Sequence, residues 1–169
     1  MRTRMKGVAK LTPLKDALDT LIKHTGLQSL DIEEIPLEDA LGRVLAADVI
    51  APYSIPPFNR AAVDGYAVRA EDTFGASPTS PITLKLKPEV IEAGAASTSK
   101  LSEGEAVEIY TGAPLPKGAN AVVMAENAVR EHEKLYVLSP VSPWQNVSRE
   151  GEDFKAGEAV LHKGHMLKP

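Results

Sequence analysis

The chain has no cysteine among its 169 residues, and this absence excludes three kinds of chemistry. A disulfide framework, a thiolate metal site and a cysteine nucleophile all need the missing thiol. The sequence also lacks an uninterrupted apolar span and the hydrophobic region of a secretory signal. We therefore expect a cytoplasmic protein without a membrane partner.

Aromatic residues and basic runs are scarce as well. Aromatic side chains make up 5% of the chain and there is one tryptophan, which disfavours a small carbohydrate-binding β-barrel because such modules need exposed stacking rings. The formal net charge is −4, and no run of Lys or Arg appears beyond residues 1–6, so no nucleic-acid partner is predicted. The remaining composition, 43% hydrophobic and 25% charged, is that of an ordinary globular chain of one domain or two small ones.

The N-terminal part favours a helix. Thr12 can cap it, Pro13 fits the first helical position and Gly26 ends it, while apolar residues between them recur at helical spacing. These apolar residues are Leu14, Ala17, Leu18, Leu21 and Ile22. A short helical turn is predicted over 37–41. Residues 44–50 are interpreted as plain core, and their periodicity leaves helix or strand open.

From Ala51 onward, prolines and short β-rich runs separated by Gly, Ser and Pro replace the helical pattern. Strands are predicted over 82–87, 106–111, 121–124 and 135–138, with a further candidate at 160–161. This spacing predicts a mostly β fold with some α, containing a small β-barrel or sandwich.

Two segments of this β-rich part set polar groups beside glycines. Residues 56–69 read PPFNRAAVDGYAVR, in which Asp64 and Gly65 can supply the positive backbone angles of a tight turn before a strand. Residues 108–123 read EIYTGAPLPKGANAVV, a strand that ends at Thr111 and turns at Gly112. Two turns are thus predicted to present one carboxylate and one hydroxyl.

A third segment, residues 145–153, reads QNVSREGED. Arg149 is a candidate anion contact because a guanidinium forms two parallel bonds to phosphate, and Asn146 and Ser148 add neutral donors. The alternative is a surface salt bridge from Arg149 to a neighbouring acidic residue, namely Glu150, Glu152 or Asp153. No metal-ligand pattern is predicted within the chain.

In this order, and within a match that runs from about Thr12 to the last residue, the three motifs closely resemble the molybdopterin molybdenumtransferases, the MoeA family that includes the E domain of gephyrin. The resemblance implies a discontinuous α+β domain, residues 1–51 with 142–169, into which a β-rich domain, residues 52–141, is inserted. These correspond to family domains I and II. The family's α/β oxyanion-binding domain and its C-terminal β domain are absent from the sequence, so we expect the N-terminal half of the enzyme.

The resemblance also implies a reaction. The family enzyme is a transferase that inserts molybdate, or tungstate, into adenylylated molybdopterin and yields molybdenum cofactor and AMP. It uses a divalent metal such as Mg²⁺, whose site is expected mostly outside this chain, and its active site forms across a homodimer. The implied catalytic residues are Asp64 and Thr111, and the implied substrate-binding residues are Gly65, Gly112, Asn146, Ser148 and Arg149.

The sequence departs from the family pattern in two places. The chain has the single Arg149 where many bacterial relatives carry several consecutive arginines, and Ala61 and Val63 where many have Ser and Met. We expect the chain alone to be inactive, because the pterin and oxyanion sites belong to the absent domain. The alternative is a noncatalytic dimerisation or scaffold module of the same fold, and the retained Asp64 and Thr111 favour the enzyme.

Overall fold

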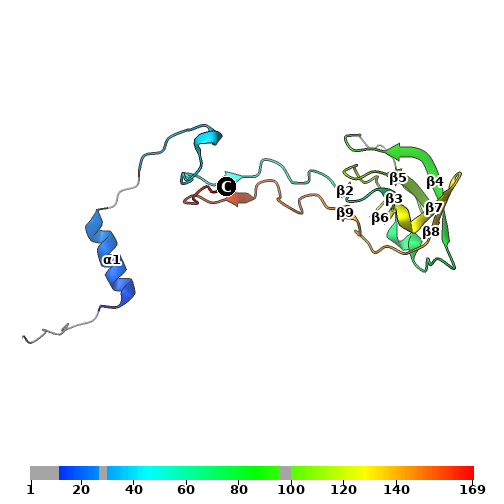
Figure 1. Cartoon of the computed structure of the whole chain (residues 1–169), viewed down its shortest axis with the longest axis horizontal. Coiled ribbons are helices and arrows are strands. Elements are labelled where there is room, and N and C mark those ends of the chain that lie inside the picture. The colour runs from blue at the N-terminus through cyan, green and yellow to red at the C-terminus, as the bar shows by residue number, and fades with distance from the viewer. Residues whose placement is uncertain (1–11, 27–29, 96–99) are drawn as a thin grey trace, which may run out of the picture.

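The computed structural model describes residues 12–26, 30–95 and 100–169. Figure 1 shows an extended molecule with helix α1 (Leu14–Thr25) at one end and a compact β-rich part at the other. Between them lies a narrow ribbon in which residues 42–55 run beside residues 154–167. We call the compact β-rich part, residues 59–148, the β head. We call the paired segments 42–55 and 154–167 the ribbon.

A six-stranded sheet forms most of the β head, in the order β6-β3-β5-β4-β8-β7. Its strands are β3 (Gly65–Val68), β4 (Ile82–Ile91), β5 (Glu105–Ile109), β6 (Ala121–Met124), β7 (Ala128–Glu131) and β8 (Lys134–Val137). Neighbouring strands are antiparallel except β4 and β5, which are parallel. Two-stranded pairs join β1 (Val49–Ile50) to β10 (Ala159–Leu161) and β2 (Arg60–Ala61) to β9 (Val147–Ser148). Three 3-10 turns complete the described elements: η1 (Leu37–Asp39), η2 (Ala70–Thr73) and η3 (Ala125–Asn127).

The predicted mostly β fold with some α is confirmed, and the predicted strands correspond to β4, β5, β6, β8 and β10. The short strands β2, β7 and β9 were not predicted, because two to four residues show too little alternation to be separated from a loop. The predicted turn over 37–41 is the 3-10 turn η1.

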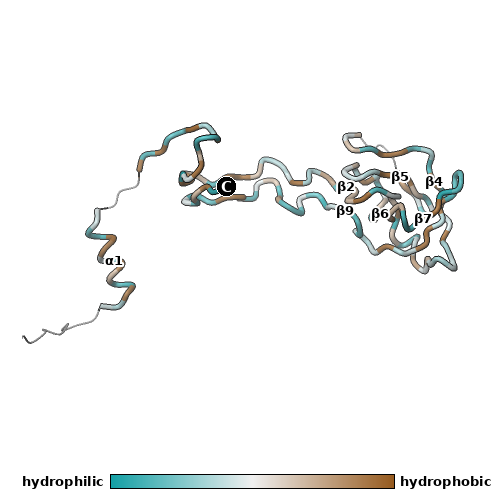
Figure 2. Tube along the Cα trace, viewed as in Figure 1, coloured by the Kyte–Doolittle hydropathy of each residue, from teal (hydrophilic) through white to brown (hydrophobic). Residues whose placement is uncertain are grey.

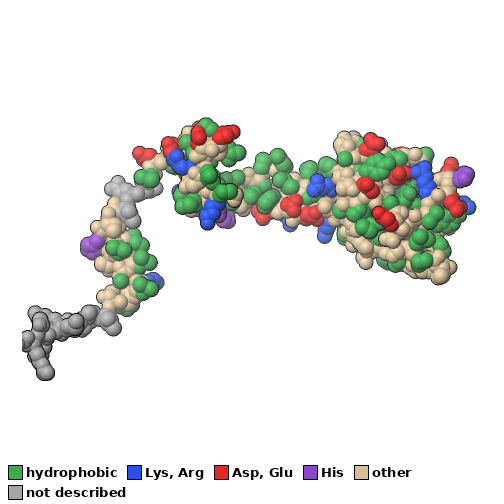
Figure 3. All heavy atoms as spheres, viewed as in Figure 1, with side chains coloured by type: hydrophobic (Ala, Val, Ile, Leu, Met, Phe, Trp, Pro, Cys, Tyr) green, Lys and Arg blue, Asp and Glu red, His purple; other side chains and the backbone are tan. Residues whose placement is uncertain are grey.

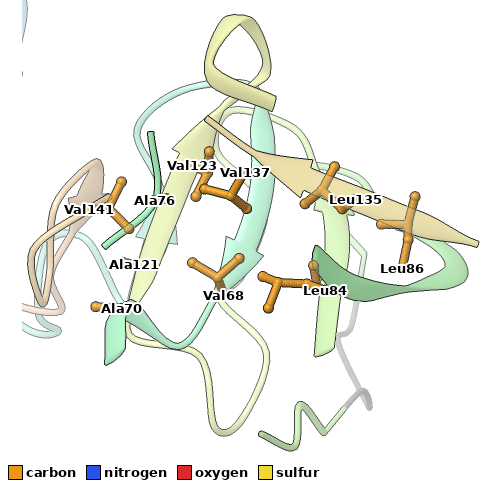
Figure 4. Close-up of a cluster of buried hydrophobic side chains, with 11 residues drawn as sticks. Val68, Ala70, Ala76, Leu84, Leu86, Ala121, Val123, Leu135, Val137 and Val141 are labelled. Carbon is orange, nitrogen blue, oxygen red and sulfur yellow. The ribbon is translucent and has the colours of Figure 1, made fainter. Parts of the chain in front are cut away.

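Buried hydrophobic clusters lie on both faces of the six-stranded sheet, although β7 contributes no buried residue to either. On one face the side chains of Val68, Leu84, Val123 and Val137 point toward a common interior (Figure 4). On the other face a second cluster gathers residues from the strands and from the segments that cross them: Ala61, Ala67, Ile91, Leu101, Val107, Ile109, Ala113, Val122 and Val147. Because neighbouring residues of a strand point to opposite faces, each central strand contributes to both clusters. The second cluster therefore fixes β2, β9 and the loop after β5 against the sheet.

The ribbon is built differently, from backbone pairing with few buried side chains. The N–H of Leu45 donates to the carbonyl of His165 (2.9 Å), and the N–H of Gly164 donates back to Leu45 (2.8 Å). The interpretation of residues 44–50 as plain core is wrong for this structure, since Val44 is 58% exposed and Ile50 48%. A two-stranded ribbon has no second layer of described residues to cover it, so its apolar side chains stay at the surface. Figure 2 marks the apolar stretches of the ribbon in brown.

Helix α1 begins and ends close to the prediction. Its N-cap is Pro13, without a side-chain capping hydrogen bond, so Thr12 does not cap the helix as predicted. Gly26 ends the helix with φ of 60°, a left-handed conformation that glycine adopts without strain. Among the described residues, no helix combines the length and the apolar composition that crossing a bilayer requires.

The predicted tight turn at Asp64 and Gly65 is wrong. Neither residue has a positive φ, and Gly65 is the first residue of β3, paired with Ile109 on one side and Met124 on the other. Glycine is needed for another reason: a Cβ on Gly65 would lie 2.0 Å from the carbonyl oxygen of Val123. The motif therefore marks a close approach of two strands.

Replacing Gly65 with alanine is expected to lower the free energy of unfolding by about 3 kcal/mol, because either β3 or β6 must move to accept the methyl group. Urea denaturation followed by circular dichroism measures this loss. Gly75→Ala is the matched control, since no atom lies within 4 Å of its Cβ and its positive φ alone should cost about 1 kcal/mol. Equal losses in the two variants would contradict the close-approach explanation.

Candidate functional site

Asp64 and Thr111, predicted separately as site residues, are direct hydrogen-bond partners. The backbone N–H and the hydroxyl of Thr111 both donate to Oδ1 of Asp64, each at 2.7 Å. The two residues are 47 positions apart in sequence, and the pairing of Gly65 with Ile109 between β3 and β5 brings them together. The carboxylate and the hydroxyl therefore form one unit at the ends of two adjacent strands.

The environment of Asp64 keeps its carboxylate ionised. The backbone N–H of Thr111, and next its hydroxyl, lower the pKa of Asp64 below its ordinary value of 3.8. Within the described part of the chain, no hydrogen bond is made by Oδ2, and the side chain is exposed. A carboxylate with one oriented oxygen and one open oxygen suits binding of a cation or a hydroxyl donor better than proton transfer.

Gly112 fixes the position of Thr111. Its φ is 83°, a conformation that favours glycine, and its N–H donates to the carbonyl of Ala61 at 2.8 Å. The N–H of Ala61 donates in turn to the carbonyl of Ala113 at 2.9 Å. The loop after β5 is thus hydrogen-bonded to β2, so the first and second motifs lie side by side.

The third motif joins through β9, which pairs antiparallel with β2, Arg60 opposite Ser148 and Ala61 opposite Val147. Asn146 has a φ of 59°, and its side-chain Nδ2 donates to the carbonyl of Val122 at 2.8 Å. The amide donor of Asn146 is therefore used to hold the loop against β6. Strand β2 lies between the other two motifs and brings all three into one region of the β head.

The guanidinium of Arg149 contacts a ring instead of a carboxylate. It lies over the indole of Trp144, 4.8 Å from the ring centroid. Across residues 12–26, 30–95 and 100–169, no Asp or Glu oxygen lies within 4.0 Å of its nitrogen atoms. The alternative of a surface salt bridge to Glu150, Glu152 or Asp153 is therefore not what the structure shows.

Three residues near these motifs were not predicted as part of the site. Glu152, named from sequence only as a possible salt-bridge partner of Arg149, accepts the backbone N–H of Arg149 at 2.9 Å. This bond, ahead of the hydroxyl of Ser148, lowers the pKa of Glu152. Asn59 accepts the N–H of Glu150 on its side chain at 2.8 Å. Trp144 had been counted only as the single tryptophan. The carboxylate three residues after Arg149 was a usable signal for Glu152, whereas Asn59 and Trp144 depend on tertiary contacts.

A complete metal site is not formed within the described residues, where no group of three His, Asp or Glu side chains gathers in metal-binding geometry. The open Oδ2 of Asp64 fits one ligand of a divalent cation, since carboxylate oxygen is the donor that Mg²⁺ prefers.

Three comparisons relate the chain to known proteins. Residues 12–169 match the family model described as the MoeA N-terminal region (domain I and II). The molybdopterin molybdenumtransferase of Staphylococcus epidermidis is 38% identical over 164 residues, 95% of this chain and 38% of that protein. The molybdopterin molybdenumtransferase 2 of Mycobacterium tuberculosis is 44% identical over 135 residues, 80% of this chain and 33% of that protein.

A crystal structure of a molybdopterin biosynthesis moeA protein from Pyrococcus horikoshii OT3 aligns with a TM-score of 0.82 at 48% identity, covering 95% of this chain and 41% of that one. The chain thus spans between 33% and 41% of the length of these relatives.

Replacing Thr111 with valine is expected to raise the pKa of Asp64 toward 3.8, because the hydroxyl donor is lost while the backbone N–H remains. In the wild type the folded-state pKa of Asp64 is lowered, so its ionised carboxylate stabilises the folded protein. This contribution to the free energy of unfolding is fully present above the unfolded-state pKa and is lost as pH falls through the folded-state pKa. NMR titration of the Asp64 carboxyl carbon measures the shift. Thr111→Ser keeps the hydroxyl and should titrate as the wild type does. An identical pKa in all three proteins would disprove the role of the hydroxyl.

Proposed function

Since the chain belongs to the family of MoeA N-terminal regions, we propose that it acts as the N-terminal portion of a molybdopterin molybdenumtransferase. The reaction inserts molybdate, or tungstate, into adenylylated molybdopterin and gives molybdenum cofactor and AMP. It takes place in the cytoplasm, the compartment expected for a chain without cysteine. The names of the relatives support this assignment, and the hydrogen-bonded pair of Asp64 and Thr111 is the observation that carries it.

The pair of Asp64 and Thr111 fits a reaction in which phosphate charge must be neutralised. Cleaving a phosphoanhydride requires neutralisation of phosphate charge, which Mg²⁺ supplies when bound. Asp64 would hold the cation, or a hydroxyl of the substrate, through Oδ2, because Oδ1 is occupied by Thr111. Thr111 orients the carboxylate, and Gly65 places Asp64 by letting β3 approach β6 closely. Gly112 leaves the backbone beside Thr111 without a side chain that would block the substrate.

The third motif supplies the anion contact in this proposal. Arg149 has five N–H donors and no carboxylate within ion-pair distance among the described residues, so it can form two parallel bonds to a phosphate. The hydroxyl of Ser148, next to it, interacts with Glu152 and so helps to hold the loop. Asn146 contributes by shaping the loop, since its amide is bonded to Val122.

We keep the two-domain division as part of the proposal, with residues 1–51 and 142–169 in one domain and residues 52–141 inserted. The backbone bonds that pair residues 42–55 with residues 154–167 support such a return of the chain. A scaffold module of the same fold is the second candidate. The retained pair of Asp64 and Thr111 favours the enzyme over a scaffold module.

The test uses an intact enzyme in which this chain is followed by the remaining family domains. Asp64→Asn and Thr111→Val should each lower the rate of AMP release, Thr111→Val by roughly 10- to 100-fold because it acts through the carboxylate. The double variant should lose little more than Asp64→Asn, since the two residues act as one unit. AMP release from adenylylated molybdopterin and molybdate is the measurement.

Two controls accompany this experiment. The isolated chain should release no AMP, and appreciable release would place a complete site within these residues. Thermal unfolding of each variant should stay near that of the wild type. If stability falls in proportion to activity, the pair is a structural link and the catalytic assignment fails.

The homodimer is a further part of the proposal, and α1 supports it. None of its residues is buried, although one side of the helix is apolar. Leu14 is 86% exposed, and Leu18, Leu21 and Ile22 are each more than half exposed. Figure 3 shows hydrophobic side chains gathered along α1 and the ribbon. An isolated helix of 12 residues is marginal in water, so this helix needs an apolar surface to pack against. A second copy offers the same surface through two-fold symmetry.

Light scattering of the chain at micromolar concentration should therefore report about twice its mass of 18.1 kDa. Leu18→Asp combined with Ile22→Asp should return the monomer mass, because both charges fall on the apolar side of α1. Asp19→Lys changes charge elsewhere on the helix and should leave the dimer intact. A monomeric wild type over a wide concentration range would show that α1 packs against something other than a second copy.

A further inference from the structure

Trp144 and Arg149 form a contact that the proposed reaction does not yet use. The guanidinium lies 4.8 Å from the centroid of the indole, a distance at which a cation is attracted to the face of the ring. Trp144 is 39% exposed, so the contact lies at the surface. Arg149 directly follows β9, on the segment that pairs with β2 beside the loop after β5. The segment that carries Arg149 is thus connected through β2 to the loop that holds Thr111 beside Asp64.

The backbone of Trp144 is held in a conformation that large residues rarely adopt. Its φ is 67°, in the left-handed region, and its N–H donates to the carbonyl of Asn120 at 2.6 Å. Asn120 is itself fixed, since its side chain accepts the N–H of Ala70 at 2.7 Å and donates to Glu71. A strained conformation persists only where the surroundings enforce it, and here the enforced result is a ring presented to Arg149.

An arginine side chain at a surface normally samples many rotamers, and ordering it costs binding free energy. A ring that already holds the guanidinium in one place removes much of that cost before the ligand arrives. A carboxylate in the same position would also order the arginine, but it would neutralise the charge and occupy its donors. The indole orders Arg149 and leaves its N–H groups available in the plane of the guanidinium.

We propose that Trp144 is a positioning residue that holds the guanidinium of Arg149 ready for a phosphate group of the nucleotide substrate. This inference rests on the proposed function, in which Arg149 is the anion contact. Trp144 acts through Arg149, so its loss should weaken phosphate binding without abolishing it.

The experiment uses the purified chain with ADP as the phosphate-bearing probe and adenosine as the probe without phosphate. Affinities are measured by calorimetry for the wild type and four variants. Trp144→Asn removes the ring while keeping a residue that tolerates a left-handed backbone, and Trp144→Phe keeps an aromatic face. Arg149→Met removes the charge at the site. Arg130→Met removes a charge from β7, where Arg130 pairs with Glu108, and is the matched control.

We expect Trp144→Asn to weaken ADP binding roughly 3- to 10-fold, and Trp144→Phe to stay within about 2-fold of the wild type. Arg149→Met should abolish detectable ADP binding, Arg130→Met should leave it unchanged, and adenosine should not distinguish the variants. If Trp144→Asn binds ADP as the wild type does while Arg149→Met does not, the positioning role is overturned and the anion contact stands. If Arg149→Met binds like the wild type, or if the wild type does not bind ADP, both the anion contact and the inference fail.

A second measurement needs no ligand and remains valid if Trp144→Asn destabilises the loop. Trp144 is the single tryptophan of the chain, so its fluorescence reports this contact alone. Removing the whole side chain uncovers a ring face, and acrylamide quenching should therefore increase in Arg149→Ala and stay unchanged in Arg130→Ala. Equal quenching in the wild type and Arg149→Ala would show that the stacked contact is not populated, which overturns the proposal.

Discussion

The close approach of β3 to β6 at Gly65 is the constraint on which the site depends. The missing side chain lets β3 lie between β5 and β6 with Gly65 opposite both Ile109 and Met124. This register sets Asp64 beside Thr111, because both residues lie just beyond the ends of the paired strands. A shift of one residue would point Asp64 to the other face and break both hydrogen bonds to its carboxylate. Backbone packing, which carries no charge, thus determines where the charge sits.

The second buried cluster explains why three separate motifs reach one region. Ala61, Ala113 and Val147 come from three different segments, and each is buried on the same face of the sheet. Burying these small side chains brings the three backbones close enough to share hydrogen bonds, as between Gly112 and Ala61. The polar residues next to them are therefore exposed but held by a rigid base. Arg149 is the exception, since its long side chain needs a separate contact, and the indole of Trp144 provides it.

The other half of the molecule is organised by pairing instead of burial. In the ribbon, backbone hydrogen bonds are satisfied between the two strands while Val44, Val49 and Ile50 remain exposed. Helix α1 shows the same imbalance, with apolar residues along one side and none of them buried. Exposed apolar surface of this extent is typical of regions that pack against another protein surface. The proposed dimer and the further domains of the longer relatives are both consistent with it.

The sequence by itself determined the local elements and the family. Proline and glycine placement and period-2 alternation predicted β4, β5, β6 and β8 within a few residues, and apolar spacing with Gly26 predicted α1. These signals are local, since each depends on residues within one turn or one strand. The three motifs identified the family because their order and length are specific. They also predicted Asp64, Thr111 and Arg149 as site residues, but they did not predict the contacts that these residues make.

Tertiary structure decided those contacts and reversed some local interpretations. Asp64 and Gly65 look like a turn in sequence, yet Gly65 is a strand residue, because the atom that demands glycine belongs to Val123, 58 positions away. Residues 44–50 look like core, yet none of them is buried, because burial depends on a covering layer that no local pattern specifies. Trp144 gave no signal beyond its rarity, and only the folded loop places it under Arg149. Interactions between distant residues are set by register and packing, which a local pattern in one sequence does not encode.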